Sequence, residues 1–216
     1  MEGNLNITFA VNKNSILDKI AINSYYRGER LKEENGAHAA RMQAGVDDED
    51  VLKDEIGIAA ADVAAMITRN LGRCVVREDD FLRVSFNGKV WELESKEDAP
   101  EGNYLRVEDN IHVYIEGTIA AGEDVTVREV VAGTIYNGTV VSLAGDYSFE
   151  TVAASNFPMS LKKAVEGAIA TYMFDKALEG WLLINMPAEV QALAQRSVAD
   201  AEKLRQLLVE RSKPIR

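Results

Sequence analysis

The spacing of apolar residues changes twice along the chain, from a helical period to a period of two and back, and this change limits the possible folds. In the last stretch, residues 187–216, apolar or small residues recur at steps of three and four, which places them on one face of a helix. They are Val190, Leu193, Ala194, Ser197, Ala201, Leu204 and Leu208. Because a single helix cannot bury such a stripe, the chain must supply partner helices elsewhere.

Other segments show the same helical period. The predicted helical ranges are 15–34, 37–44, 47–71, 160–180 and 187–212. Ser15 and Asp47 are predicted N-caps, because their side chains can accept hydrogen bonds from the free N–H groups of a first helical turn. Gly180 is predicted to interrupt the helix that starts at Ser160, because glycine is a poor helix former.

The middle of the chain alternates apolar and polar residues, which is the period of a β-strand. Asn87-Gly88 lies between two such runs, and Asn-Gly at this place is the strongest short-range signal of a β-hairpin. The predicted strands are 81–86, 90–94, 104–107, 111–115, 125–131, 133–141 and 147–152, and a further strand or extended arm is predicted over 5–11. About seven short strands in the middle segment predict a small antiparallel barrel or sandwich.

Together these patterns predict an α+β protein. The N-terminal and C-terminal helices, within residues 1–76 and 155–216, are expected to form one discontinuous helical bundle, because each of them needs a partner for its apolar stripe. Residues 77–154 are expected to form an inserted β domain. Such an insertion is compatible with a continuous bundle if its two ends lie close together.

The negative charge of the chain is concentrated in this β segment. Residues 78–150 hold 16 Asp or Glu and 5 Lys or Arg, so this segment accounts for the entire formal net charge of −11. A surface of this sign repels phosphate groups, which argues against direct binding of nucleic acid. The charge favours solubility, and it also offers an acidic surface to a basic protein partner.

Motifs of known chemistry are absent from the sequence. It has no Walker, dinucleotide-binding, G-x-S-x-G or paired-cysteine motif. His38 and His112 are far apart, and His112 is expected on the solvent face of its strand. Cys74 is interpreted as an unreactive buried thiol, and the acidic run 47–50 as a helix start and not as a metal site. We therefore expect a protein without catalytic residues, cofactor or metal.

Two features of the C-terminal half are candidates for contacts between subunits. One is a run of large apolar residues, which suits either the core or an interface. The other is the basic end of the chain, which suits either the C-terminal dipole of a helix or contact with an acidic neighbour, such as the β segment of another copy. The residues are Trp181, Leu182, Leu183 and Ile184 in the first case, and Arg211, Lys213 and Arg216 in the second.

Several segments at the two ends of the chain carry a family resemblance. In the N-terminal part they are Asn12-Lys13-Asn14-Ser15-Ile16-Leu17-Asp18-Lys19-Ile20-Ala21, Ser24-Tyr25-Tyr26-Arg27-Gly28 and Asp47-Asp48-Glu49. In the C-terminal part they are Ile169 to Met173, Gly180-Trp181-Leu182 and Glu210-Arg211-Ser212-Lys213-Pro214-Ile215-Arg216. These segments resemble a group of proteins from prophages of gut Bacteroides-type bacteria, for which no catalytic residues are known. The β segment carries none of the resemblance.

The resemblance implies a structural protein of a phage virion, from the neck: a head–tail connector, adaptor or tail-completion protein that assembles in rings. The implied partners are other phage structural proteins or copies of the chain, in the bacterial cytoplasm during assembly and then in the virion. No small-molecule substrate is expected, and no membrane contact, because no run of the sequence is long and apolar enough to span a bilayer. The residues leave two alternatives open, an intracellular protein-binding module that uses its acidic β domain and a hydrolase of an unrecognised type.

Overall fold

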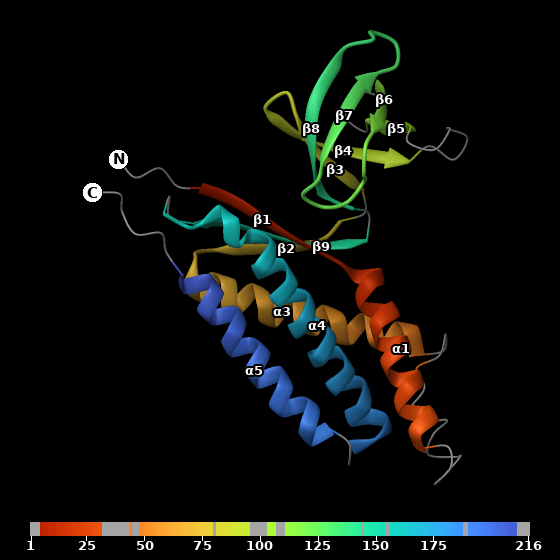
Figure 1. The fold of residues 1–216 in the computed structure, drawn as a ribbon, viewed down its shortest axis with the longest axis vertical. Helices are drawn as coiled ribbons and strands as arrows, with labels where there is room; N and C mark the ends of the chain where they lie inside the picture. The colour runs from red at the N-terminus through yellow and green to blue at the C-terminus, as the bar shows by residue number, and fades with distance from the viewer. Residues whose placement is uncertain are drawn as a thin grey trace. The chain divides into compact units, whose positions relative to one another are not determined.

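The computed structural model describes residues 5–31, 44, 48–79, 81–95, 103–106, 111–143, 145–153, 156–187 and 190–210. The protein belongs to the α+β class and divides into two compact units (Figure 1). Residues 1–76 and 149–216 make up the first unit, and residues 77–148 make up the second. The first unit is thus built from both ends of the chain and the second from its middle.

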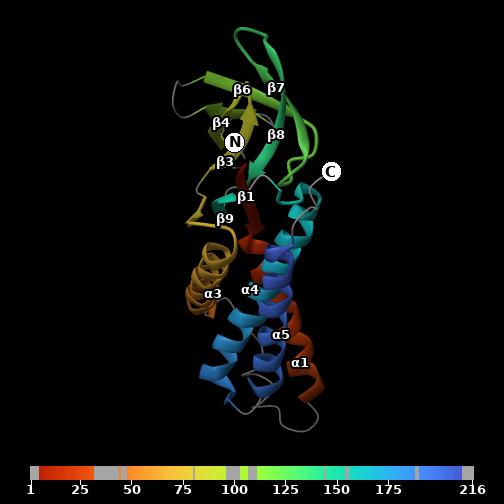
Figure 2. The ribbon, with the colours of Figure 1, turned by 90° about the vertical axis from the view of Figure 1, so that its left-hand side faces the viewer.

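The first unit combines helices with a small sheet. Its described helices are α1 (Lys13–Leu31), α3 (Glu49–Asn70), α4 (Lys162–Asn185) and α5 (Val190–Val209), with a short 3₁₀ helix, η2 (Met159–Leu161), before α4. Its sheet contains β1 (Leu5–Asn12), β9 (Asp146–Ala153) and β2 (Cys74–Glu78), in the order β1-β9-β2. Figures 1 and 2 show α4 crossing the middle of this unit, where it packs against α1, α3 and α5.

Helix α4 is buried around most of its circumference. Its buried residues are Val165, Ala168, Ile169, Tyr172, Met173, Phe174, Asp175, Ala177, Leu178, Trp181 and Leu182. Residues 172–175 are four consecutive buried positions, which is more than one full turn of a helix. A helix that is apolar on several sides belongs to a core and not to a surface. This explains why other elements of the first unit are arranged around it.

Helix α5 has a single apolar face, and the predicted stripe is confirmed. The buried residues are Leu193, Ser197, Ala201, Leu204 and Leu208, while Val190 and Ala194 are half-buried. The helix packs on α4 and α3, which are the partner helices that the stripe requires. The predicted end near Ser212 lies outside the described residues.

Helix α1 begins two residues earlier than predicted. The side chain of Asn12, the last residue of β1, accepts a hydrogen bond from the backbone N–H of Ser15 at 2.8 Å. Asn12 is therefore the N-cap, and the prediction that Ser15 fills this position was wrong. Asn and Ser cap helices about equally well, so residue type alone does not favour Ser15 over Asn12. The predicted cap Asp47 and all of the predicted helix 37–44 except Ala44 lie outside the described residues.

Helix α4 continues through Gly180, so the predicted interruption was wrong. A Cβ atom at this position would lie 1.9 Å from Oε2 of Glu55 on α3 and 2.4 Å from its Cδ. Gly180 therefore provides the space that the Glu55 side chain occupies. Glycine costs a helix about 1 kcal/mol relative to alanine, and the packing of a buried helix outweighs that cost.

The second unit is a barrel of six antiparallel strands. These are β3 (Leu82–Phe86), β4 (Lys89–Ser95), β5 (Asn103–Arg106), β6 (Ile111–Glu116), β7 (Asp124–Glu129) and β8 (Ile135–Ser142). They pair in chain order, and β3 also pairs with β8, which closes the sheet. The predicted strand 147–152 is not part of this barrel, because β9 lies in the sheet with β1 and β2. Alternation identifies a strand but does not say which sheet it joins.

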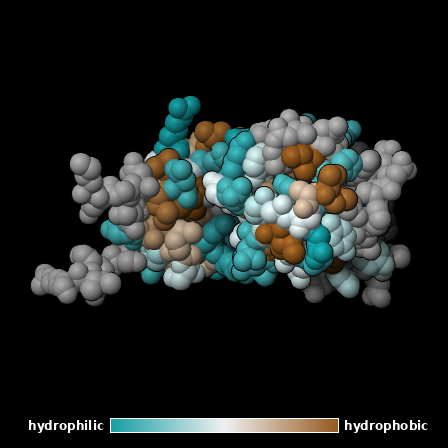
Figure 3. All heavy atoms as spheres, turned by 90° about the horizontal axis from the view of Figure 1, so that it is seen from above, coloured by the Kyte–Doolittle hydropathy of each residue, from teal (hydrophilic) through white to brown (hydrophobic). Residues whose placement is uncertain are grey.

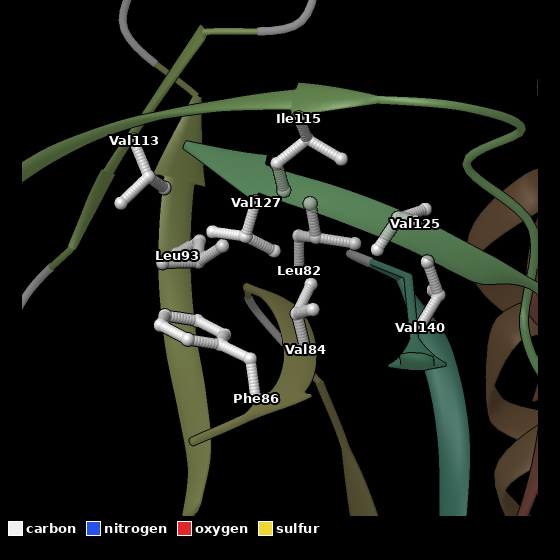
Figure 4. Packing of buried hydrophobic residues seen from close by; sticks show 9 residues of the cluster. All are labelled: Leu82, Val84, Phe86, Leu93, Val113, Ile115, Val125, Val127 and Val140. Carbon is white, nitrogen blue, oxygen red and sulfur yellow. The ribbon is translucent and has the colours of Figure 1, made fainter. Parts of the chain in front are cut away.

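The predicted hairpin at Asn87-Gly88 is confirmed. Both residues have a positive φ, 50° and 73°, as a type I′ turn requires, and Phe86 pairs with Lys89 across it. The inward side chains of the strands fill the barrel (Figure 4). They are Leu82, Val84, Phe86, Leu93, Val113, Ile115, Val125, Val127 and Val140.

Two glycines of α4 provide a matched test of the packing at Gly180. An added Cβ at Gly167 meets nothing within 4 Å, whereas one at Gly180 meets the Glu55 carboxylate. We expect Gly167→Ala to raise the free energy of unfolding by about 1 kcal/mol through helix propensity. Gly180→Ala should raise it by less than that, because the Glu55 carboxylate must first move to make room. Urea unfolding followed by circular dichroism measures both effects.

The double variant Glu55→Ala/Gly180→Ala is the control for this prediction. With the carboxylate removed, the alanine at position 180 has room and its helix propensity should have its full effect, so Gly180→Ala should stabilise the Glu55→Ala background. Equal effects of alanine at positions 167 and 180 would contradict the packing role.

Candidate functional site

A cluster of buried polar side chains lies where the chain enters and leaves the barrel. Asp79, Arg83, Asp146 and Ser148 are all at least nine-tenths buried, and we call them the entry cluster. The main chain joins the two connections directly. The N–H of Asp79 donates to the carbonyl of Asp146 at 2.8 Å, and the N–H of Gly145 donates to the carbonyl of Asp79 at 2.6 Å. The two ends of the inserted segment are therefore held side by side.

The charges of the entry cluster are partly compensated within it. Oδ1 of Asp79 lies 3.6 Å from Nη1 of Arg83, and Oδ2 accepts a hydrogen bond from the hydroxyl of Ser148. The carboxylate of Asp146 accepts a hydrogen bond from the N–H of Leu143 at 2.7 Å. A β-bulge in the pairing of β3 with β8 lies at Arg83 and Val84. A charge buried this deeply needs such partners, because leaving it unpaired costs several kcal/mol.

A pocket of about 240 Å³ opens beside the entry cluster. Its lining residues are Arg77, Glu78, Asp79, Phe81, Arg83 and Glu92. Arg77 and Glu92 lie 3.9 Å apart, so acids and bases face each other across this pocket. The hydroxyl of Ser148 bonds to a carboxylate that also faces Arg83, and this contact does not supply the base that activates a serine nucleophile. The geometry supports a clamp on the chain.

A second polar group is buried between α4 and α5. Asp175 has no exposed surface, and its Oδ1 lies 2.9 Å from Nη2 of Arg196. Burial raises the pKa of Asp175 from 3.8 to about 6, the neighbouring Asp200 carboxyl acts in the same direction, and Arg196 opposes the rise. The Asp175 carboxyl therefore retains a proton into mildly acidic solution.

Tyr172, three residues before Asp175 on α4, links α4 to α3. Its hydroxyl donates to Oδ2 of Asp62 at 3.2 Å, and burial followed by the charge of Asp62 raises the pKa of Tyr172 to about 12. The phenol therefore remains a hydrogen-bond donor. Neither Asp175 nor the bond of Tyr172 to Asp62 was predicted from the sequence. The available signal was a lone acidic residue, Asp175, inside an otherwise largely apolar helical stretch.

An open groove of about 470 Å³ lies on strands β6, β7 and β8 of the barrel. Its lining residues are Glu116, Gly117, Asp124, Val125, Thr126, Asn137, Gly138 and Thr139. Glu116 lies 3.3 Å from Arg128, and Asp124 accepts a hydrogen bond from the Thr139 hydroxyl at 3.0 Å. Carboxylates, an amide and hydroxyls suit a basic partner that brings hydrogen-bond donors.

The predicted interface residues fall into separate places. Trp181 and Leu182 are 1% and 0% exposed and belong to the core, whereas Leu183 and Ile184 are 59% and 65% exposed. The run therefore divides into two core residues and two exposed residues. The basic residues Arg211, Lys213 and Arg216 lie outside the described part of the chain.

The remaining candidates of the sequence show no reactive setting. Burial raises the pKa of the Cys74 thiol to about 11, and the charge of Glu150 acts in the same direction. A thiol with this pKa is a poor nucleophile at neutral pH. His112 on β6 is half-buried and is not among the core residues of the barrel, in line with the outward face expected for it. His38 lies outside the described residues.

The described residues form no candidate metal site and no membrane-spanning helix. No group of three or more His, Cys, Asp or Glu side chains in them is arranged to hold a metal ion. No helix among them is both long and apolar enough to cross a bilayer. On the face drawn in Figure 3, hydrophobic residues form separate spots among hydrophilic ones. Exposed apolar side chains include Val131, which is 92% exposed on the turn between β7 and β8.

Asp79→Ala tests the entry cluster. The substitution removes the carboxylate that faces Arg83 and Ser148, so it should lower the free energy of unfolding by about 3–5 kcal/mol. Asp79→Leu with Arg83→Met removes both charges and should recover most of that stability. Glu92→Ala is the matched control, because the pair of Glu92 with Arg77 is exposed and should contribute at most about 1 kcal/mol. Urea unfolding measures all three; equal destabilisation at Asp79 and Glu92 would contradict the clamp.

The reactivity of Cys74 tests its environment. With its pKa raised to about 11, the thiol should react with a disulfide reagent at about pH 8 roughly a hundredfold more slowly than free cysteine. Glu150→Gln removes a negative charge that raises this pKa, so it should lower the pKa and speed the reaction several-fold. The rate is measured as a function of pH with the folded protein. A wild-type rate equal to that of free cysteine would contradict the burial of the thiol.

Comparison with known proteins adds no relative. No family model, no curated protein and no solved structure matches this chain. The resemblance of the chain ends to prophage proteins is therefore an expectation from the residues alone, and the support for a function lies in the described geometry.

Proposed function

We propose that this chain is a non-catalytic assembly protein of a phage or prophage virion, a head–tail connector, adaptor or tail-completion component of the neck. The proposal combines the resemblance of the chain ends with one structural observation. Leu183 and Ile184 are 59% and 65% exposed, directly after Trp181 and Leu182, which are fixed in the core. Apolar side chains that are presented by a rigid helix end suit a contact with another subunit. This exposed pair carries the proposal.

In this proposal α1, α3, α4 and α5 act as one helical bundle, and the barrel is its inserted domain. The support is that α4 packs against each of the other three helices and that both ends of the chain contribute to this unit. The backbone bonds between Asp79 and residues 145–146 bring the ends of the insertion together, which is the condition for a bundle to continue across it.

The proposed partners are copies of the chain arranged in a ring, or other structural proteins of the phage. A ring uses two different patches on each copy, so the apolar pair on α4 would meet a different surface of the next subunit. The protein would work in the bacterial cytoplasm during assembly and afterwards in the virion, without a small-molecule substrate, a cofactor or a membrane. The acidic middle segment argues against direct contact with nucleic acid.

The test compares the wild type with the double variant Leu183→Ser/Ile184→Ser. Light scattering coupled to size-exclusion chromatography gives the molar mass at rising protein concentration. We expect the wild-type mass to rise toward a closed ring. The variant should need at least roughly tenfold more protein, because each apolar side chain buried in the interface contributes about 1 kcal/mol or more to association. Because both side chains are exposed, the melting temperature should stay unchanged.

The control variant is Val131→Ser on the barrel turn, which should assemble as the wild type does. A wild type that stays monomeric from micromolar to millimolar concentration, or a double variant that assembles normally, would contradict the proposed contact.

The gene neighbourhood tests the phage assignment independently. Terminase, portal and capsid genes beside this gene support it, and metabolic genes contradict it.

The groove on the barrel favours a second candidate function, the binding of a basic protein segment. Glu116 and Asp124 line this groove, and both are exposed. Glu116 pairs with Arg128, and Asp124 accepts a hydrogen bond from Thr139. An incoming lysine or arginine could take the place of Arg128 and Thr139 in these two contacts. A monomeric wild type in the light-scattering experiment would favour this candidate over ring assembly.

A further inference from the structure

Helix α1 has large apolar side chains on the side that points away from the core of the first unit. Its inner side is buried and contains residues at steps of four, which are Ile16, Ile20 and Ser24. On its outer side three residues are 57%, 51% and 64% exposed, in the order Ile22, Tyr25 and Tyr26, and we call them the α1 patch. A surface helix usually has charged or polar residues on this side, so the packing of the first unit does not explain the patch.

The α1 patch has the composition of a protein interface. Its members are three and four residues apart, which places them on one face of the helix. The rings of Tyr25 and Tyr26 meet edge to face, with centroids 5.9 Å apart and an angle of 72° between their planes. Nε of Arg27 donates a hydrogen bond to Oδ1 of Asn23 at 3.3 Å, so polar groups adjoin the patch in the sequence of the same helix. Tyrosine and arginine are both enriched where proteins bind one another.

Other exposed large apolar residues on the described α-helices are more scattered. Val51 and Ile58 on α3 are about two turns apart, and Val198 and Val209 on α5 are about three turns apart. The remaining compact group on these helices is the exposed pair at the end of α4, on which the proposed function depends. The α1 patch and this pair both belong to the first unit, so a single compact body presents them.

A contact between these two groups would remove enough apolar surface from water to form the centre of an interface. A tyrosine buries about 150–250 Å² when it is fully covered, so the half-exposed α1 patch offers roughly 300 Å². Apolar patches of this size are often binding sites. With the α4 pair of a second copy, the contact would hide roughly 500 Å² of apolar area, which is about a third of a standard interface and leaves the rest to a polar rim.

We propose that the α1 patch binds the exposed Leu183 and Ile184 of a second copy of this chain, head to tail. Branched aliphatic side chains of one copy then pack on the aromatic rings of the next. The inference rests on the proposed function for the role of Leu183 and Ile184, and it names the surface that they meet. Each copy uses two different patches, so it can contact two neighbours at once.

Two double variants test this contact, Tyr25→Ser/Tyr26→Ser and Leu183→Ser/Ile184→Ser. Serine and tyrosine have similar helix propensities and both tyrosines are exposed, so the helix content and the melting temperature of the tyrosine variant should stay unchanged. In light scattering coupled to size-exclusion chromatography, each variant alone should need at least roughly tenfold more protein than the wild type to assemble.

An equal mixture of the two variants tests the head-to-tail arrangement. One variant keeps its α1 patch and the other keeps its apolar pair on α4, so one productive contact remains between them. At a concentration where each variant alone is monomeric, the mixture should reach twice the mass of one chain and no more, because neither end of this dimer has a complete patch left to offer.

Ile58→Ser is the matched control, a side chain on α3 that is 54% exposed, and it should assemble as the wild type does. If the tyrosine variant assembles normally while Leu183→Ser/Ile184→Ser does not, the inference is overturned and the proposed contact remains. A mixture of the two variants that stays monomeric also overturns it, because like patches would then meet each other. A wild type that stays monomeric contradicts the proposed function and this inference together.

Discussion

The burial of α4 is the constraint on which the first unit depends. Helices α1, α3 and α5 pack on it, and the Ala10 N–H of β1 bonds to its Glu166. Each large apolar side chain taken from water contributes about 1.5–3 kcal/mol, and α4 buries several, including Met173, Leu178 and Trp181. The two ends of the chain are far apart in sequence, and this shared burial explains why they belong to one unit.

The same burial explains where polar groups are placed in this unit. A carboxylate cannot be buried without compensation, so Asp175 lies 2.9 Å from the guanidinium of Arg196 on α5. Tyr172 uses its hydroxyl on Asp62, and Gly180 leaves space for Glu55. These polar contacts connect α4 to α3 and α5 at defined positions, which apolar packing alone does not specify.

The sequence predicted those features whose signal is local. The stripe of α5 and the hairpin at Asn87-Gly88 were predicted correctly, because period and turn chemistry depend on neighbouring residues. The features that depend on tertiary partners were not. The helix passes through Gly180 because the packing of α4 outweighs the cost of a glycine, and β9 joins a sheet with β1, which is more than 130 residues earlier in the chain. The position of one helix cap was also predicted wrongly, because Asn12 and Ser15 are equally suitable as caps by residue type.

For the candidate sites, the sequence alone could not tell that Leu183 is exposed while Leu182 is buried, because a run of apolar residues suits both the core and an interface.

The backbone bonds between Asp79 and residues 145–146 have a consequence for the history of such a chain. Because the strand that enters the barrel and the strand that leaves it are in direct contact, a short reverse turn could replace everything between them. Deletion of the barrel, or its exchange for an unrelated domain by recombination, would then leave the two cut ends of the chain next to each other. A lineage of related proteins could therefore keep its helices and differ entirely in the module they carry.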